Sequence, residues 1–369
     1  MNFEILELNQ NNKGKWTNLI NDLNIEDRDV HYLPDYCEIY ENTYNYKPFL
    51  VFYGDRNNYV VQQYIKRGLN ALPFLREQNI KEEFFDVTNP YGFSGPVFKC
   101  KNFNKKVELF KEFSKALCNY FMENKIASEF VSLHPLINNY EIVSNTDLVK
   151  LNYEKDVIVV NLTQNSSDIE KGFNRGNKSN INKARKLGIK IEKVKISSNN
   201  LNIFKNFYYR TMERKSASAK WFFPENFFEN TFNSLGENRV SLFFAILAGS
   251  IISTYFIIHD YGKVYYHFGG SDSNYGCYRP NNLLMYEIIL WAKEHGFELF
   301  HLGGGVTSSE SDSLFQFKSS FSKNRIPLYS YNRINNSIIY DYLCELKKTY
   351  EVSDNSEIRN LDYFPLYRR

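Results

Sequence analysis

The stretch NLLMYEIILWAKEHGFELFHL, residues 282–302, carries the pattern that decides the fold. Apolar residues recur there at the spacing of one helix face: Leu284, Ile288, Trp291 and Ala292. Gly296 is suited to end this helix, because glycine readily adopts the left-handed conformation that follows many helix C-termini. Residues 297–302 are mostly apolar and read as a strand. We therefore predict a helix over 282–295 that leads directly into a strand.

Three apolar segments precede this helix and predict a meander of antiparallel strands. They cover residues 241–247, 251–259 and 263–268. The turns between them are Ala248-Gly249-Ser250 and Asp260-Tyr261-Gly262, whose glycines favour tight hairpins. This half therefore reads as antiparallel strands followed by a helix and a strand.

The first half of the chain repeats the same order of elements. Apolar segments at 3–8, 48–53 and 59–61 predict strands, and residues 105–124 show helical spacing before a strand at 130–133. The shared order suggests an internal duplication that has diverged in sequence. We predict an α/β (α+β) protein with two similar domains, each a mixed, mostly antiparallel sheet flanked by helices.

The length of 369 residues also favours two domains, because a single hydrophobic core rarely grows beyond about 250–300 residues. We place an N-terminal domain at 1–157 and a C-terminal domain at 158–335. Residues 336–369 are expected to form a helix and a tail that pack back on the domains.

Composition excludes several classes of protein. Hydrophobic residues make up 43% of the chain, which is too much apolar surface for a disordered chain. No apolar run reaches the ~18 residues that span a bilayer, and the N-terminus lacks the pattern of a signal peptide. We therefore expect a cytoplasmic protein without a transmembrane segment.

Cysteines, charge and short motifs narrow the classes further. Five cysteines without a C-x-x-C pair predict neither a disulfide framework nor a zinc site, so no metal is expected. A net charge of +3 is too small to indicate nucleic-acid binding by itself. The sequence contains no G-x-S-x-G, H-E-x-x-H or P-loop motif, and Gly303-Gly304-Gly305 does not continue as a dinucleotide-binding G-x-G-x-x-G.

Four passages occur in this order along the chain: NPYGFSGP at 89–96, RGNKSNINKARKLG at 175–188, and the segments 207–223 and 301–321. Together they resemble the FemAB family of the GNAT superfamily. The resemblance spans nearly the whole chain and is strongest over 158–335. It implies tandem GNAT-like domains, an acyl acceptor held in a cleft, and a donor that enters where the last two strands of one half splay apart. Members of this group load amino acids onto peptidoglycan precursors and surface sugars.

The resemblance also implies the co-substrates. No tightly bound cofactor is expected, and the donor is an aminoacyl-tRNA or an acyl-CoA. The chain departs from some tRNA-dependent relatives because residues 186–208 are too short and too β-like for their coiled-coil arm. It departs from acetyl-CoA enzymes because residues 274–281, NYGCYRPN, lack the paired glycines of the loop that grips pyrophosphate.

Lys318 is the first catalytic candidate. It follows the glycine-rich segment 303–305 within the sequence FQFK, and the resemblance places a charge-stabilising lysine there. Attack of an amine on an ester or thioester builds a tetrahedral oxyanion that a fixed cation would stabilise. The alternative is an exposed lysine whose stem passes two buried phenylalanines.

Two histidines are candidate bases. His267 and His301 fall near the ends of the two strands expected to splay, and Tyr265 shares a strand face with His267 because side chains alternate. A base is needed to deprotonate an ammonium acceptor, unless solvent or the substrate takes the proton. A lone histidine is more often an ordinary core or surface residue than a base.

A basic helix is the main candidate for substrate binding. It carries five cations without a compensating carboxylate: Arg175, Lys178, Lys183, Arg185 and Lys186. We expect Arg175 and Lys178 to bind phosphates of a nucleotide-sugar, a lipid pyrophosphate or a tRNA end, because a polyanion relieves their repulsion. The alternative is a solvated surface helix.

Further residues are expected to complete the substrate site. Tyr91 would line the acceptor cleft from a glycine- and proline-containing turn of the first half, although such a turn can also be purely structural. Arg214 and Lys215, on a predicted helix, are surface residues or a second phosphate contact. The expected substrate-binding set is Tyr91, Arg175, Lys178, Arg214, Lys215, Tyr265 and Arg279.

These features favour an acyltransferase that forms an amide on an amine of a cell-surface glycan precursor, either an amino sugar or a peptidoglycan-type peptide. The expected partners are a nucleotide-sugar or lipid-linked precursor and, as one possible donor, tRNA; peripheral membrane contact is compatible with such a substrate. Two alternatives stay open: a CoA-dependent N-acetyltransferase of a nucleotide-linked amino sugar, and a non-catalytic RNA- or glycan-binding module.

Overall fold

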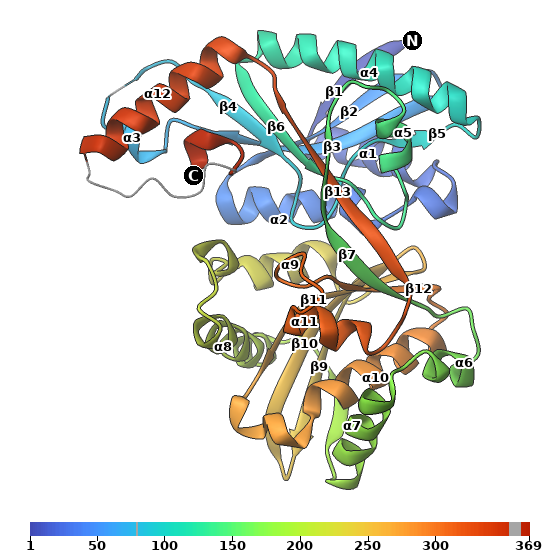
Figure 1. Cartoon of the computed structure of the whole chain (residues 1–369). Coiled ribbons are helices and arrows are strands. Elements are labelled where there is room, and N and C mark those ends of the chain that lie inside the picture. The colour runs from blue at the N-terminus through green and yellow to red at the C-terminus, as the bar shows by residue number, and fades with distance from the viewer. Residues whose placement is uncertain (79, 354–362) are drawn as a thin grey trace. The chain divides into compact units, whose positions relative to one another are not determined.

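The computed structural model describes residues 1–78, 80–353 and 363–369 (Figure 1). These residues form an α/β protein in which helices flank mixed, mostly antiparallel sheet, as the sequence predicts. Within the described part of the chain, no helix has both the length and the apolar character that crossing a bilayer requires.

The chain divides into two compact units. Unit 1 comprises Met1–Glu154 and Leu328–Arg369, and unit 2 comprises Lys155–Pro327. The last strand explains why unit 1 is discontinuous, because its residues Ser330–Ile334 pair with a strand of the N-terminal segment. The expected boundary at 335 therefore differs from this division, which returns the chain to unit 1 at Leu328.

Unit 1 contains a sheet in the order β1-β2-β3-β4-β6-β13, and the short strand β5 pairs with β3. Its strands are β1 (Asn2–Glu7), β2 (Lys47–Gly54), β3 (Tyr59–Gly68), β4 (Phe85–Thr88), β5 (Val97–Lys99), β6 (Ile126–Ser132) and β13 (Arg325–Ile334). Neighbours are antiparallel except β4 and β6, which are parallel.

Helices of unit 1 pack on this sheet and around its edges. They are α1 (Gln10–Asn21), α2 (Pro34–Tyr44), α3 (Pro73–Arg76), α4 (Phe103–Glu123), α5 (Tyr140–Ser144) and α12 (Ser337–Ser353). Helix α4 begins at a cap, where Asn102 accepts the N–H of Lys105 at 3.0 Å, and buries Phe113, Leu117 and Phe121 completely. The predicted helix over 105–124 is thus confirmed. The tail helix α12 packs against α3 and β6.

In unit 2 the strand order is β7-β12-β11-β10-β9-β8. Its strands are β7 (Leu151–Asn161), β8 (Lys190–Val194), β9 (Val240–Leu247), β10 (Ser250–Asp260), β11 (Lys263–Ser271) and β12 (Leu299–Gly303). The predicted meander is β9, β10 and β11, and all neighbours are antiparallel except β11 and β12.

Helices cover both faces of the unit 2 sheet. They are α6 (Ser166–Lys171), α7 (Arg175–Lys186), α8 (Ser198–Arg214), α9 (Phe227–Leu235), α10 (Pro280–Glu294) and α11 (Ser313–Ser319). Tyr255 and Ile257 of β10 share a core with α7 and α10, which cover one face. Between them, Phe256 points the other way and lies 5.4 Å from Phe204 of α8, ring centroid to ring centroid. The α7 and α8 helices therefore lie on opposite faces of this sheet.

Candidate active site

A glycine turn follows β12 and leads toward α11. Gly303 has a φ of +80°, and a side chain there would place Cβ 2.8 Å from Nζ of Lys318. At Gly304, Cβ would lie 2.6 Å from the main-chain oxygen of Asp156 in β7. The left-handed backbone at Gly303 therefore favours glycine, and position 304 requires it because of close packing against the main chain.

Asp312 holds this turn from the side of α11. Its Oδ1 accepts the N–H groups of Leu314 and Phe315 at 2.9 and 3.0 Å and so caps the helix. Its Oδ2 accepts the N–H groups of Val306 and Thr307, each at 3.0 Å. Partial burial opposes ionisation of Asp312, but these backbone N–H groups prevail and lower its pKa. One carboxylate thus ties the turn to the helix that carries Lys318.

Lys318 is buried beside the turn, with 5% of its surface exposed. Its Nζ donates a hydrogen bond to the carbonyl oxygen of Gly304 at 2.8 Å and lies 5.3 Å from the ring centroid of Tyr266. Burial, together with the nearby positive charge of Lys155, lowers the pKa of Lys318 to about 7 against the opposing effect of Asp312. The alternative of a solvent-exposed lysine is therefore wrong.

Gly304→Ala is expected to destabilise unit 2, because its Cβ would overlap a main-chain oxygen that β7 holds in the sheet. Overpacking of this kind typically costs about 1–3 kcal/mol of unfolding free energy. Urea denaturation measures the loss. Gly276→Ala is the matched control, since no atom lies within 4 Å of the position its Cβ would take. Equal stability of the two variants would contradict the close packing of the turn.

The strands β11 and β12 diverge close to this turn. Their parallel pairing ends at Tyr265 and His301, whereas β11 continues to Ser271. The pairing of β11 with β10 skips His267, which is therefore the extra residue of a β-bulge. Alternation alone did not predict this bulge, because a bulge depends on the partner strand.

The two candidate bases lie away from the contacts of Lys318. The Tyr266 ring beneath Lys318 packs 4.7 Å from Tyr255, on the face that α7 and α10 cover. His301 instead lies 5.6 Å from Tyr265, and His267 lies 6.5 Å from Phe256, both between ring centroids. The structure thus brings His301 and Tyr265 together, but these ring contacts are on the opposite face of the sheet from Tyr266.

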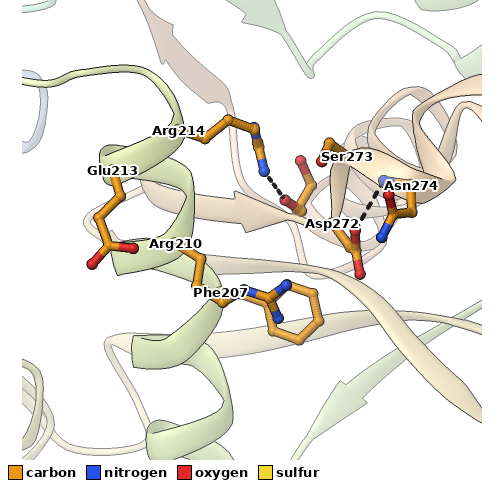
Figure 2. A pocket seen from close by; sticks show the side chains of 8 residues that line it. Phe207, Arg210, Glu213, Arg214, Asp272, Ser273 and Asn274 are labelled. Carbon is orange, nitrogen blue, oxygen red and sulfur yellow. Dashed lines mark hydrogen bonds between the residues drawn. The ribbon is translucent and has the colours of Figure 1, made fainter.

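A pocket of about 270 Å³ lies at the end of β11 (Figure 2). It is lined by α8 and by the segment after β11: Phe207, Arg210, Glu213, Arg214, Ser271, Asp272, Ser273 and Asn274. Arg214 donates from Nη1 to the carbonyl oxygen of Ser271 at 2.9 Å. Arg210 was not singled out from the sequence, although its position four residues before Arg214 on a helix was an available signal. Lys215 is exposed just after α8 and is outside this lining.

The basic helix α7 is exposed, but its positive charge is partly offset by a carboxylate of another helix. Arg185 forms an ion pair with Glu287 of α10 at 3.0 Å, and its guanidinium stacks 4.5 Å from the ring centroid of Tyr286. The expectation of no compensating carboxylate is therefore wrong for Arg185, because its partner is distant in sequence. Arg175 and Lys178 are exposed near the start of the helix. They lie on the opposite sheet face from Arg214, so the structure does not gather the predicted phosphate contacts into one site.

Two further predicted residues lie outside these groups. Arg279 is exposed immediately before α10 and has a left-handed backbone, with a φ of +62°. Tyr91 belongs to unit 1, where its N–H donates to the hydroxyl of Tyr40 at 2.6 Å and its carbonyl accepts from Tyr36 at 2.5 Å. Burial raises the pKa of the Tyr91 hydroxyl to about 12. These contacts fix the turn through its main chain.

Among the described residues of unit 1, the parallel strands β4 and β6 do not diverge as β11 and β12 do in unit 2. Beyond the parallel pairing of β4 and β6, Ser94 forms a further parallel bridge with Leu133. The side chain of Asn89 also accepts the N–H of Ser132 at 2.8 Å. The turn over 89–96 thus closes the place in unit 1 that corresponds to the open strands of unit 2.

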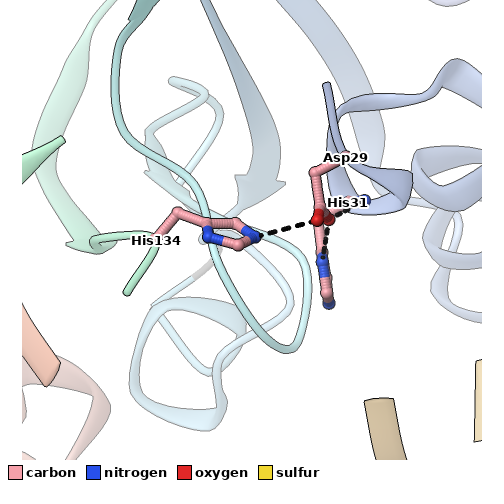
Figure 3. A group of neighbouring side chains, drawn as sticks. All are labelled: Asp29, His31 and His134. Carbon is pink, nitrogen blue, oxygen red and sulfur yellow. Dashed lines mark hydrogen bonds and ion pairs between the residues drawn. The ribbon is translucent and has the colours of Figure 1, made fainter. Parts of the chain in front are cut away.

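A buried cluster of Asp29, His31 and His134 supports the same turn (Figure 3). His134 accepts the N–H of Leu136 at Nδ1, so its Nε2 carries the proton and donates to Asp29 at 3.2 Å. His31 donates from Nδ1 to the other carboxylate oxygen at 2.6 Å. Burial opposes ionisation of Asp29, but the two imidazoles prevail and hold its pKa well below the usual value. The three side chains thus form a buried hydrogen-bonded network in which both imidazoles face one carboxylate. A Cβ at Gly92 would lie 2.5 Å from Nε2 of His31, which explains the glycine in the turn.

Comparisons with known proteins agree with this architecture. The model of the family described as "Acetyltransferase (GNAT) domain" matches residues 178–319, all within unit 2. The chain is 26% identical over 147 residues to a UDP-N-acetylmuramoylpentapeptide-lysine N(6)-alanyltransferase of Weissella viridescens, a match that spans 40% of this chain and 42% of that protein. The crystal structure of FemX has a TM-score of 0.66 at 14% identity and covers 91% of this chain and 99% of its own.

A second solved structure indicates the tandem arrangement. A tandem GNAT protein from the clavulanic acid biosynthesis pathway has a TM-score of 0.50 at 6% identity, covering 89% of this chain and 98% of its own. Identities this low show the fold alone. The match to the GNAT acetyltransferase domain over residues 178–319 and the sequence relative agree with the resemblance found in the sequence, which is to FemAB-like proteins of the GNAT superfamily.

Proposed function

We propose that the chain is an acyltransferase that forms an amide on an amine of a cell-surface glycan precursor. The observation that carries this proposal is the buried Lys318, held by a glycine turn next to the diverging strands of unit 2. The name of the Weissella viridescens relative, which describes alanyl transfer to a lysine N6 amine, supports amide formation. The acceptor amine belongs to an amino sugar or to a peptidoglycan-type peptide.

For this reaction, a cation that stabilises the oxyanion is more important than a strong base. The acceptor nitrogen attacks the carbonyl carbon of an ester or thioester, and the carbonyl oxygen becomes an oxyanion. Collapse of this intermediate breaks the bond to the leaving alcohol or thiol, which takes up a proton while the nitrogen loses one. The ammonium of Lys318 would stabilise the oxyanion in a site that excludes water. A pKa of about 7 also allows this side chain to exchange a proton near neutral pH.

The donor is an aminoacyl-tRNA or an acyl thioester that enters where β11 and β12 diverge. The loop after β11 supports a donor other than conventional acetyl-CoA, because it forms a 3₁₀ turn over Ser273–Tyr278 without paired glycines. Both kinds of donor are made in the cytoplasm, which favours a reaction at that location. A donor panel tests the choice. Pure protein is incubated with an amino-sugar acceptor and one donor at a time, either alanyl-tRNA or acetyl-CoA, and each donor is labelled in its acyl group. Transfer from acetyl-CoA alone would support the N-acetyltransferase alternative, and binding without transfer would support the non-catalytic one.

Two separate groups of cations support two phosphate-bearing substrates. Arg210 and Arg214 line the pocket at the end of β11 together with the carboxylates of Glu213 and Asp272, and Arg175 and Lys178 are exposed on the opposite face. The pocket is suited to the phosphates of a nucleotide-sugar or lipid-linked acceptor, because arginine binds phosphate oxygens through paired N–H groups. The longer exposed surface of α7 is suited to a polyanion such as tRNA.

Arg175→Glu combined with Lys178→Glu is expected to raise KM for the substrate that α7 binds and to make its binding less sensitive to salt. The reason is that each lost phosphate contact removes released counterions from the binding equilibrium. Steady-state kinetics between low and physiological salt measure both effects. The control is Lys111→Glu with Lys115→Glu, two exposed cations of α4 in unit 1. An unchanged KM for every substrate would show that α7 is a solvated surface helix and binds no substrate.

A further inference from the structure

Lys155 of β7 holds the same glycine turn as Lys318. Its Nζ donates to the carbonyl oxygen of Gly305 at 2.8 Å and to that of Val306 at 3.3 Å. Its stem fills the space beside Gly304, where a Cβ would lie 2.7 Å from Cδ of the lysine. Lys155 therefore contacts the turn through both its charge and its methylene groups.

The two lysines bind successive carbonyl oxygens of one turn. Lys318 binds that of Gly304 and Lys155 binds that of Gly305. The charged and titratable groups that face Lys318 come from three elements: Lys155 on β7, Asp312 at the start of α11, and the Tyr266 ring on β11. Asp312 is already engaged by four backbone N–H groups, so its charge only partly offsets the repulsion between the two ammonium groups.

We propose that Lys155 is a positioning residue for Lys318. Its hydrogen bond to Gly305 holds the turn, in which the Gly304 carbonyl oxygen accepts a hydrogen bond from the Lys318 ammonium. Lys155 also places a second positive charge beside that ammonium. This inference rests on the proposed acyl transfer for its kinetic consequence, but its electrostatic consequence is independent of any activity. The repulsion makes the Lys318 ammonium a better partner for a developing oxyanion, because an added negative charge relieves it.

Three substitutions separate the parts of this role. Lys155→Met keeps much of the apolar stem and removes the charge and the hydrogen bonds. Lys155→Gln keeps an N–H donor for the turn and removes the charge. Lys155→Arg keeps both the charge and the donors. Because none of them alters Lys318 itself, changes in the ionisation of Lys318 report on its surroundings.

The test is an NMR titration of protein labelled with ¹³C at the lysine Cε, in which Lys318→Arg identifies the Lys318 signal. In Lys155→Met and Lys155→Gln, Lys318 is expected to titrate at higher pH, by about one unit, because a like charge has been removed. In Lys155→Arg it should titrate as in the wild type. Unchanged titration in both neutral variants, with the fold intact by circular dichroism, would overturn the proposal.

The pH dependence of kcat separates failure of this inference from failure of the proposed function. We expect the alkaline limb of kcat to move with the Lys318 titration, and Lys155→Gln to keep more of the wild-type rate than Lys155→Met because it still holds the turn. If the titration moves but no acyl transfer is found with any substrate, the electrostatic role stands and the proposed function falls. If Lys155→Met does not fold, the Gln and Arg variants still give the comparison.

Discussion

Lys318→Met is expected to lower kcat and kcat/KM together by about 100- to 1,000-fold, the usual loss when one oxyanion donor is removed. Methionine matches the length and much of the volume of the lysine stem, so the packing against Tyr266 should survive. Substrate affinity should change little, because the ammonium contributes mainly in the transition state. Steady-state kinetics with a saturating donor measure both parameters.

Lys323→Met is the control for this variant. Lys323 is exposed and follows Lys318 by five residues in the sequence, so its loss should leave the rate within a few-fold of the wild type. If Lys318→Met also kept its rate within a few-fold, Lys318 would not stabilise the oxyanion. A rise in KM alone would instead assign Lys318 to substrate binding.

The same Lys318→Met variant is expected to be more stable than the wild type at low pH. Lys318 has a pKa of about 7 in the folded chain, against an ordinary value of 10.5. The unfolded chain therefore holds this proton more tightly, and the protonated lysine favours unfolding. Replacing the lysine should raise the unfolding free energy by on the order of a few kcal/mol, because the cost of burying a charge is removed. The lost hydrogen bond to Gly304 reduces this gain by about 1–3 kcal/mol.

The pH window follows from the sign of this shift. Below pH 7 the penalty on the wild type is complete, so the gain in unfolding free energy of the variant is largest there. As pH rises from about 7 to about 10.5, the wild type recovers this stability and the difference disappears. Urea denaturation at several pH values measures it. A variant that is less stable than the wild type at pH 6 would show that the ammonium is well solvated or well paired in the fold.

Local patterns predicted the central elements of both units. The sequence predicted the helix over 282–295 and the strand after it, because α10 buries Leu284, Ile288 and Ala292 of the predicted face and Gly296 follows its end with a φ of +77°. The sequence predicted the meander because the turns between its strands are short and contain glycine. The position of Lys318 after a glycine-rich segment was also informative, since glycine is required where a main chain packs closely.

Contacts between distant segments were not predictable in the same way. Lys155 precedes its partner Gly305 by 150 residues, and nothing near it in the sequence marks the contact. The ion pair between Arg185 and Glu287 links two helices and was equally hidden. The bulge at His267 depends on pairing with β10, and so alternation could not place that side chain. Sequence patterns therefore pointed to Lys318 as a candidate, but they did not reveal the groups that set its charge and position.

The most direct test of the account is the mass of the product formed from a defined amine. Pure protein is incubated with a nucleotide-linked amino sugar or a peptidoglycan-type peptide, together with alanyl-tRNA or an acyl thioester, and the acceptor is analysed by mass spectrometry. The account predicts that the acceptor gains the mass of the transferred carboxylic acid less one water, that the new bond resists mild base as an amide does, and that prior N-acetylation of the acceptor abolishes the gain. Acylation of the N-acetylated acceptor, or no mass gain with any donor and acceptor while both still bind, would contradict acyl transfer to an amine.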